Sequence, residues 1–272
     1  NLGSFLATII CVWLGEVYGW SYGFGAAGVG MLLGLITFIS GKKLLMGKGE
    51  SSAPEFLEKT TFGFKNEWLI YLASMLSTEV VWQMVQRHEA VSNSLIIAGA
   101  ISFVYILYYA ITQLDKVARQ QLTALTILII FTVIFWALFE QAYTSLNLFA
   151  DRVLDRGEIA AGTFLSLNAL FIILLAPVFA WLWVKLGKYN PNTAVKFSLA
   201  LILVGLGFGS LVMGINASDL GKVAMYWLVI TYFLHTCGEL CLSPVGLSAV
   251  TKLSPPKIVG VMMGVWFLDT AS

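Results

Sequence analysis

Charged side chains are scarce in this sequence: Asp, Glu, Lys and Arg make up 11% of its 272 residues, whereas hydrophobic residues make up 58%. A soluble globular protein usually has about 25% charged residues, so the composition argues against that class. The formal net charge is +1 and there is no basic block, so nucleic acid is not an expected partner. The lipid bilayer is the expected surrounding of the chain.

Cysteine is rare as well, and its placement predicts neither a disulfide framework nor a metal centre. Cys11, Cys237 and Cys241 all fall inside apolar stretches. No further Cys and no nearby loop His completes a ligand set around the last two. Zinc-protease and P-loop patterns are missing too, so we expect no metal, no cofactor and no enzymatic activity.

Long apolar stretches are what the sequence has in abundance. At about 1.5 Å per residue, they are long enough to cross most of a ~30 Å hydrocarbon core. Strand-like alternation is missing, so an all-α polytopic membrane protein is predicted. Nine candidate membrane helices cover residues 1–20, 23–41, 67–86, 91–112, 122–150, 159–184, 194–215, 223–251 and 258–272.

Basic residues divide unevenly between the two sides that alternate along these helices, with twelve on one side and four on the other. Lys and Arg concentrate in cytoplasmic loops, so the first side is predicted to be cytoplasmic. The twelve are Lys42, Lys43, Lys48, Lys59, Lys65, Lys116, Arg119, Lys185, Lys188, Lys196, Lys252 and Lys257, and the four are Arg87, Arg152, Arg156 and Lys222.

Glycines recur four residues apart inside several of these stretches. Such spacing lets two membrane helices approach closely, so these glycines are predicted to lie at helix contacts. The pairs are Gly30 and Gly34, Gly205 and Gly209, and Gly260 and Gly264.

Glu140 interrupts the apolar stretch 122–149. An ionisable side chain inside hydrocarbon costs roughly 2.5 to 3.5 kcal/mol on insertion scales and normally faces protein or water. In one continuous helix, Trp136, Glu140 and Thr144 share a face and would line a cavity. Desolvation favours the neutral form of a carboxyl group, so Glu140 is predicted to bind and release a proton. A permanent hydrogen bond to another helix is the structural alternative.

Glu239 interrupts the stretch 223–250 in the same way, near mid-membrane. His235, Glu239 and Ser243 share a helix face, and Ser243 is a predicted substrate contact on that ground alone. Pro244 is predicted to bend the helix where a cavity supplies water. A carboxylate at such a bend suits an ammonium ligand. His235 is interpreted as a packing residue rather than a proton relay.

Asn168 offers two hydrogen-bond donors and an acceptor within an uncharged stretch. It is predicted to hold an amide or a carboxylate, with an interhelical hydrogen bond as the alternative. Two other acids are not assigned to the site: Glu79 lies in helices that are expected to be peripheral, and Glu16 lies beside aromatic residues typical of the outer membrane interface.

Several motifs occur in one order from end to end of the chain. They are NLGS from Asn1, FWALFEQ from Phe135, SLN from Ser166, GELCLSP from Gly238, GLS from Gly246 and MMGVWFL from Met262. With them the sequence resembles the proton-dependent oligopeptide transporter family of the major facilitator superfamily.

The resemblance implies a partial major facilitator fold. Residues 1–41 would be the last two helices of the N-terminal bundle, 42–66 a cytoplasmic linker, 67–112 two lateral helices, and 113–272 helices 7 to 11 of the C-terminal bundle. The linker assignment agrees with the Gly, Ser, Pro and mixed charges of that stretch. The chain is then expected to be a fragment whose partners include the remaining helices of the same transporter. The lateral helices and the short outer loop at 216–221 resemble prokaryotic members.

The resemblance also implies roles for individual residues. Glu239 matches the carboxylate that receives the amino terminus of the peptide, and Asn1 and Asn168 match amides that hold its backbone and ends. Trp136 and Trp266 match aromatic walls of the pocket, and Glu140 matches the carboxylate linked to proton coupling. Tyr143 departs from the family pattern, in which a small residue is expected; it would narrow the cavity or change side-chain preference.

The implied function is symport of di- and tripeptides with protons across the bacterial inner membrane by alternating access, with protons as the coupling ion and no cofactor. One alternative is a family relative that carries nitrate or another small solute. Another is a non-transporting membrane receptor or scaffold, in which the buried acids are purely structural.

Overall fold

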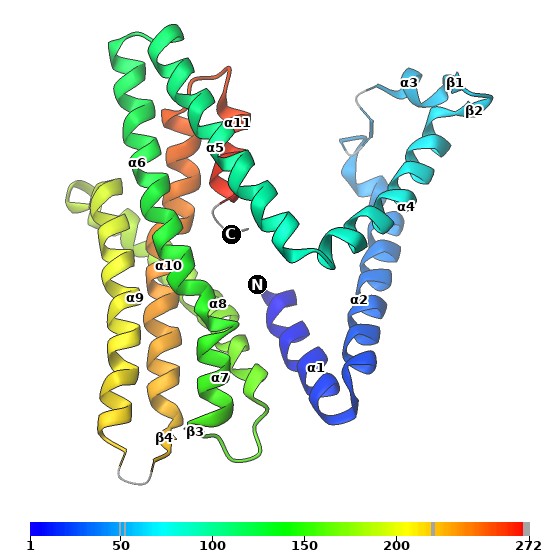
Figure 1. The fold of residues 1–272 in the computed structure, drawn as a ribbon. Coiled ribbons are helices and arrows are strands. Elements are labelled where there is room, and N and C mark those ends of the chain that lie inside the picture. Colours follow the sequence, from blue (N-terminus) through cyan, green and yellow to red (C-terminus); the bar gives the residue numbers. More distant parts are fainter. Residues whose placement is uncertain (49, 52, 219–220, 269–272) are drawn as a thin grey trace. The chain divides into compact units, whose positions relative to one another are not determined.

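The structure is a computed structural model that describes residues 1–48, 50–51, 53–218 and 221–268. Helices dominate it (Figure 1). The main helices are α1 (Leu2–Tyr18), α2 (Trp20–Gly41), α4 (Asn66–Val85), α5 (His88–Gln113), α6 (Lys116–Phe139), α8 (Ser166–Leu186), α9 (Thr193–Asn216), α10 (Met225–Leu253) and α11 (Val259–Leu268). Every predicted membrane stretch has a helical counterpart among the described residues, so the predicted all-α fold class is confirmed. Residues 269–272 of the last predicted stretch lie outside the described residues.

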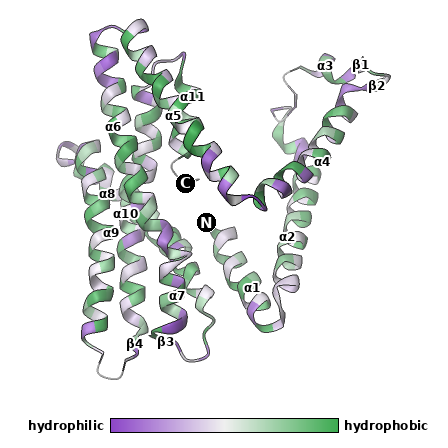
Figure 2. Ribbon diagram, viewed as in Figure 1, coloured by the Kyte–Doolittle hydropathy of each residue, from purple (hydrophilic) through white to green (hydrophobic). Residues whose placement is uncertain are grey.

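Seven helical segments of the described residues are long and apolar enough to cross a membrane, judged by length and composition. The helices α1 and α11 are apolar but shorter. Figure 2 shows hydrophobic residues along the helices and hydrophilic residues gathered at many of their ends and connections. This is the distribution expected when lipid surrounds the helix sides and water reaches the loops.

Short elements that the sequence analysis did not predict connect the long helices. The helical ones are η1 (Lys42–Leu45), α3 (Pro54–Glu58), η2 (Glu140–Ala142), α7 (Ser145–Arg152), η3 (Ala161–Leu165) and η4 (Gly187–Tyr189). The strands are β1 (Thr60–Thr61), β2 (Phe64–Lys65), β3 (Leu154–Asp155) and β4 (Val223–Ala224). β1 pairs antiparallel with β2, and β3 pairs parallel with β4, with Leu154 opposite Val223.

The chain forms two compact units, one of residues 1–27 with 101–272 and one of residues 28–100. In the second unit, Asn66 fixes the start of α4. Its Nδ2 donates to the Phe56 carbonyl and its backbone N–H to the Lys59 carbonyl, each at 2.9 Å. Phe62 and Gly63 have φ of 54° and 84°, the left-handed conformation of a tight hairpin turn between β1 and β2.

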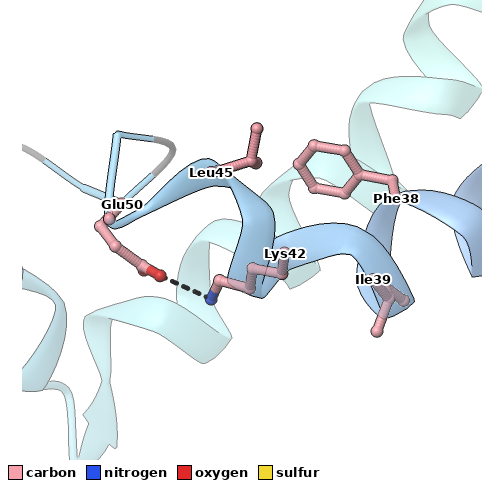
Figure 3. Close-up of a pocket in the computed structure, with 6 residues that line it drawn as sticks. Phe38, Ile39, Lys42, Leu45 and Glu50 are labelled. Carbon is pink, nitrogen blue, oxygen red and sulfur yellow. Dashed lines mark ion pairs between the residues drawn. The ribbon is translucent and has the colours of Figure 1, made fainter.

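A shallow cavity of about 300 Å³ lies beside η1 in the same unit. Figure 3 shows Lys42 there, with its Nζ 3.0 Å from Glu50 Oε1. Both side chains are more than half exposed. Exposed ion pairs of this kind contribute little to stability, so we interpret the pair as a loop contact rather than a functional centre.

The first unit is held together most extensively by α9 and α10, which pack along a row of polar contacts. Thr231 Oγ1 lies 2.9 Å from the Trp227 carbonyl of its own helix, 3.1 Å from the Gly207 carbonyl and 3.0 Å from Ser210 Oγ. His235 Nε2 lies 3.2 Å from the Val204 carbonyl, with the imidazole ring against Gly207. These buried polar groups of α9 and α10 are therefore satisfied between the two helices, as hydrocarbon requires.

The glycines that allow close helix contact differ from those predicted. None of the six predicted glycines would bring an added Cβ within 4 Å of a described atom other than those of the adjoining backbone. Gly207 and Gly214 meet His235 and Trp227 of α10 instead, and Gly246 meets Trp266. Within the described residues, therefore, these six glycines are not the contact positions, because four-residue spacing does not show which face of a helix points at a neighbour.

Arg119 joins the end of α5 to α6. Its Nε donates to the Ala110 carbonyl at 2.9 Å. Its Nη2 donates to the Ile111 and Leu114 carbonyls at 3.0 and 3.3 Å. The last carbonyls of a helix have no partner within the helix, so Arg119 acts as a C-terminal cap for α5.

Residues at the end of α1 pack against η3, which precedes α8. Glu16 Oε1 accepts a hydrogen bond from the Gly162 backbone N–H at 3.3 Å. A Cβ on Gly162 would lie 2.7 Å from Val12 Cγ1, so glycine is what permits this approach. Glu16 therefore contacts protein here, in addition to lying near the predicted outer interface.

Replacing Gly246 with alanine should destabilise the protein, because the added methyl group would overlap the ring of Trp266, which is 3% exposed. Overpacking a tight core typically costs about 1–3 kcal/mol. The measurement is the unfolding of the natural full-length protein in detergent. Gly205→Ala is the matched control, since its methyl meets open space in a helix and should leave stability equal or higher. Equal stability of both variants would contradict the packing described for Trp266.

Candidate functional site

Asn168 and Glu239 meet between α8 and α10. Asn168 lies in the first turn of α8, and Glu239 is the central residue of α10. Asn168 Nδ2 donates to Glu239 Oε2 at 2.9 Å and to Thr236 Oγ1 at 3.1 Å. The structure thus joins two residues that are 71 positions apart in the sequence, and both were predicted to hold substrate.

The carboxylate of Glu239 is only partly used by the protein. Among the described residues, the ion pairs are Lys42 with Glu50 and Arg156 with Asp151, and neither involves Glu239. Asn168 occupies Oε2, whereas Oε1 has no hydrogen bond within the described chain. A partly buried carboxylate with an open oxygen and no basic partner in this part of the protein is suited to bind a cationic group.

Glu140 lies at a break between two helices. α6 ends at Phe139, η2 covers Glu140–Ala142, and Thr144 has φ −115° and ψ −86° before α7 begins. The predicted continuous helix, with Trp136, Glu140 and Thr144 on one face, is therefore wrong.

Gln141 holds this break in place, a role that the sequence analysis missed. Its Nε2 donates to the Ala137 carbonyl at 3.2 Å, which satisfies a carbonyl at the end of α6. Its Oε1 accepts from Ser145 Oγ at 2.6 Å and from Thr144 Oγ1 at 3.3 Å. The signal in the sequence is the Gln141 amide followed by the hydroxyls of Thr144 and Ser145. Hydrogen bonds among such side chains and the nearby backbone compete with those of a continuous helix.

A small cavity adjoins Asn168. Phe139, Tyr143, Tyr232 and His235 are among the residues that line it, and its accessible space is about 10 Å³, enough for about one water molecule. Tyr143, the residue that departs from the family pattern, stands at this cavity with 62% of its side chain exposed. The narrowing effect predicted for Tyr143 stays a prediction.

Trp136 is partly buried in a cluster of aromatic rings. Its ring centroid lies 5.4 Å from that of Phe135 and 5.2 Å from that of Phe139, both edge to face. Within the described residues its buried indole N–H has no hydrogen-bond partner. Buried donors are nearly always paired, so this one is a candidate to meet a ligand acceptor.

The structure does not gather the other predicted residues at the Asn168–Glu239 pair. Asn1 is exposed, and its carbonyl accepts from the Phe5 backbone N–H at 2.8 Å. Ser243 is partly buried one turn beyond Glu239 and forms no hydrogen bond with the described residues. Trp266 packs in the core near Phe197, with ring centroids 6.5 Å apart. Their assignment to the site stays a prediction.

His235 is a packing residue in this structure, as interpreted from the sequence. It is 1% exposed and bonded to the Val204 carbonyl, and its ring lies 4.9 Å from that of Phe208. Thr236, beside it, was not predicted. It is fully buried, accepts from Asn168, and donates from Oγ1 to the Tyr232 carbonyl at 2.7 Å. Its signal in the sequence is the three-residue spacing from Glu239.

A bundle of membrane-length helices with polar side chains facing one another at its centre is the architecture of a secondary transporter. Comparison with known proteins agrees. The POT family model matches residues 1–272, and the chain belongs to this family. The fold is accordingly part of a major facilitator fold.

Two of the relatives in sequence are bacterial transporters. The chain is 39% identical over 277 residues to an uncharacterized transporter, YclF, of Bacillus subtilis (strain 168), with 100% of this chain and 56% of that protein covered. It is 34% identical over 286 residues to the peptide transporter YePEPT of Yersinia enterocolitica subsp. palearctica serotype O:3 (strain YE-P4), with 98% and 56% covered.

Solved structures of the family share the fold. A mutant of peptide transporter POT in complex with alafosfalin has a TM-score of 0.76 and 35% identity, with 100% of this chain and 56% of that chain covered. A POT family transporter in complex with a thioalcohol-conjugated peptide has a TM-score of 0.79 and 26% identity, with 100% and 58% covered. The chain therefore spans little more than half the length of these relatives.

Proposed function

We propose that the natural protein that carries this sequence is a secondary transporter that imports di- and tripeptides with protons across a bacterial cytoplasmic membrane. The observation that supports this most directly is the Asn168–Glu239 hydrogen bond. It holds a carboxylate at the centre of α10, with one oxygen open to an incoming ammonium group. Relatives named as peptide transporters, and a solved relative with a conjugated peptide bound, point to the same substrate class.

Binding at this site uses groups that every small peptide carries. The peptide ammonium pairs with Glu239, and charge-assisted hydrogen bonds of this kind are the stronger ones. Asn168 meets the peptide backbone through its amide. Trp136 contributes an apolar wall and a free N–H donor. Asn1, Ser243 and Trp266 complete the substrate contacts, and side-chain preference is broad because binding depends on the termini.

Proton coupling is assigned to Glu140. Glu140 and Glu239 both lie in membrane-length helical segments, where the gain of a proton or of a peptide ammonium offsets the cost of a negative charge. Each proton that enters an inside-negative cell gains about 2.3 kcal/mol per 100 mV, enough for about fiftyfold accumulation. Rocking of the two bundles around the site then exposes it to either side in turn.

Acetylation of the peptide amino terminus should abolish competition for this site. N-acetyl-dialanine lacks the ammonium group that Glu239 binds, so it should compete with labelled dialanine about thirtyfold less well or worse. The measurement is inhibition of dialanine uptake into proteoliposomes that contain the full-length protein. Amidated dialanine, which keeps the ammonium, is the matched control. Equal inhibition by acetylated and free dialanine would show that Glu239 has another role.

The same assay separates the alternative functions. If the site carries nitrate, added nitrate should inhibit dialanine uptake by competition. The Glu239 carboxylate argues against this alternative, because it offers an anion no favourable interaction. A scaffold would show no dialanine uptake at all, and neutralising both glutamates would change only its stability.

A further inference from the structure

The orientation of the Asn168 amide is determined by a third residue. An asparagine amide presents an NH₂ group on one side and a carbonyl oxygen on the other, and rotation by half a turn exchanges them. In this structure both N–H bonds of Asn168 are in use, one to Glu239 Oε2 and one to Thr236 Oγ1. Its Oδ1 is the acceptor that remains.

Thr236 can only accept from Asn168. A threonine hydroxyl has a single proton, and that of Thr236 is donated to the Tyr232 carbonyl at 2.7 Å within the same helix. Thr236 is 0% exposed, so water does not compete for the hydroxyl. What Thr236 offers to Asn168 at 3.1 Å is therefore a lone pair, and a lone pair requires an N–H opposite it.

The reversed amide is excluded for the same reason. It would place Asn168 Oδ1 opposite two acceptors, Thr236 Oγ1 and Glu239 Oε2, both of which accept from Asn168 in this structure. Thr236 and Glu239 are three residues apart on α10, which sets both on one face toward α8. Two acceptors side by side match the two hydrogens of one NH₂ group and reject a carbonyl oxygen.

We propose that Thr236 is a positioning residue for substrate recognition. By fixing the Asn168 amide, it keeps the NH₂ group on Glu239 and presents Oδ1 as the acceptor for a backbone or terminal N–H of the peptide. This inference rests on the proposed function of the Asn168–Glu239 pair as a peptide site, and it assigns to the pair a buried third member that touches no substrate.

The test is a set of three variants of the full-length protein. Thr236→Val keeps the shape and removes the hydroxyl, whereas Thr236→Ser keeps the hydroxyl. Thr132→Val is the matched control, because Thr132 is also fully buried and also donates to the carbonyl four residues earlier, that of Leu128, but lies on α6 and has no hydrogen bond with Asn168 or Glu239. Loss of one oriented hydrogen bond should weaken dialanine binding by about three- to tenfold in Thr236→Val. Thr236→Ser and Thr132→Val should stay within about twofold of the wild type.

A second measurement does not depend on peptide binding. The infrared band of the Glu239 carboxylate, assigned by its loss in Glu239→Gln, should shift in ligand-free Thr236→Val and return to its position in Thr236→Ser. A shifted band in a protein that binds no dialanine would reject the peptide function but keep the positioning role. An unshifted band with unchanged affinity in Thr236→Val would overturn the inference, as would an equal loss of affinity in Thr132→Val.

Discussion

Glu239→Gln should weaken binding of dialanine by about thirtyfold or more, because removing one member of a desolvated charge pair costs about 2–5 kcal/mol. Glutamine keeps the shape and still accepts a hydrogen bond from Asn168, so the helix contact survives. What disappears is the negative charge that pairs with the peptide ammonium. The affinity is measured by calorimetry on the purified full-length protein, together with its thermal unfolding.

Glu79→Gln is the matched control for this prediction. Glu79 lies within α4, another membrane-length helix, where its Oε1 accepts from Gln83 Nε2 at 3.1 Å on an exposed face. Glu79→Gln loses the same charge in the other compact unit, outside the unit that holds Asn168 and Glu239, and should bind dialanine normally. If Glu239→Gln bound dialanine as tightly as the wild type, the assignment of the ammonium to Glu239 would be wrong.

Glu140→Gln should separate peptide binding from energy coupling. The variant should exchange dialanine across the membrane, because the Asn168–Glu239 pair is intact. It should lose accumulation against a gradient, because glutamine does not carry the proton. The expected loss is large, since one proton at 100 mV supports about fiftyfold accumulation. Counterflow and gradient-driven uptake in the same proteoliposomes measure the two activities.

Glu158→Gln serves as the control for proton coupling. Glu158 lies outside the long helices, in the exposed connection between β3 and η3. Its neutralisation should leave accumulation and exchange unchanged. Loss of exchange together with accumulation in Glu140→Gln would place Glu140 in substrate binding instead, and retention of both would remove it from the mechanism.

The sequence was sufficient to predict the membrane helices, since each depends on a long run of apolar residues and little else. It was also sufficient to single out Asn168 and Glu239, because polar groups inside such runs are costly and few. The structure joins these two side chains, and their role in binding stays a prediction. The break after Phe139 could not be predicted in this way. It depends on the Gln141 side chain, whose bonds to Ala137, Thr144 and Ser145 compete locally with the helix.

Contacts between helices were the least predictable part of the site. Thr236 resembles any other threonine in an apolar helix until α8 places Asn168 beside it. Trp266 packs against Gly246 because of how α10 and α11 are oriented toward each other. Amino-acid composition does not predict that orientation. The strands β3 and β4 are only two residues each and lie far apart in the sequence. No local sequence pattern therefore predicts that they pair.

The measurement that tests the account most directly is uptake of labelled dialanine by proteoliposomes that contain the full-length protein, with an acidic exterior and a negative interior. Dialanine should accumulate above its external concentration, and this accumulation should collapse when a protonophore is added. Absence of uptake by a preparation shown to be folded, or uptake that a protonophore does not affect, would contradict proton-coupled peptide transport.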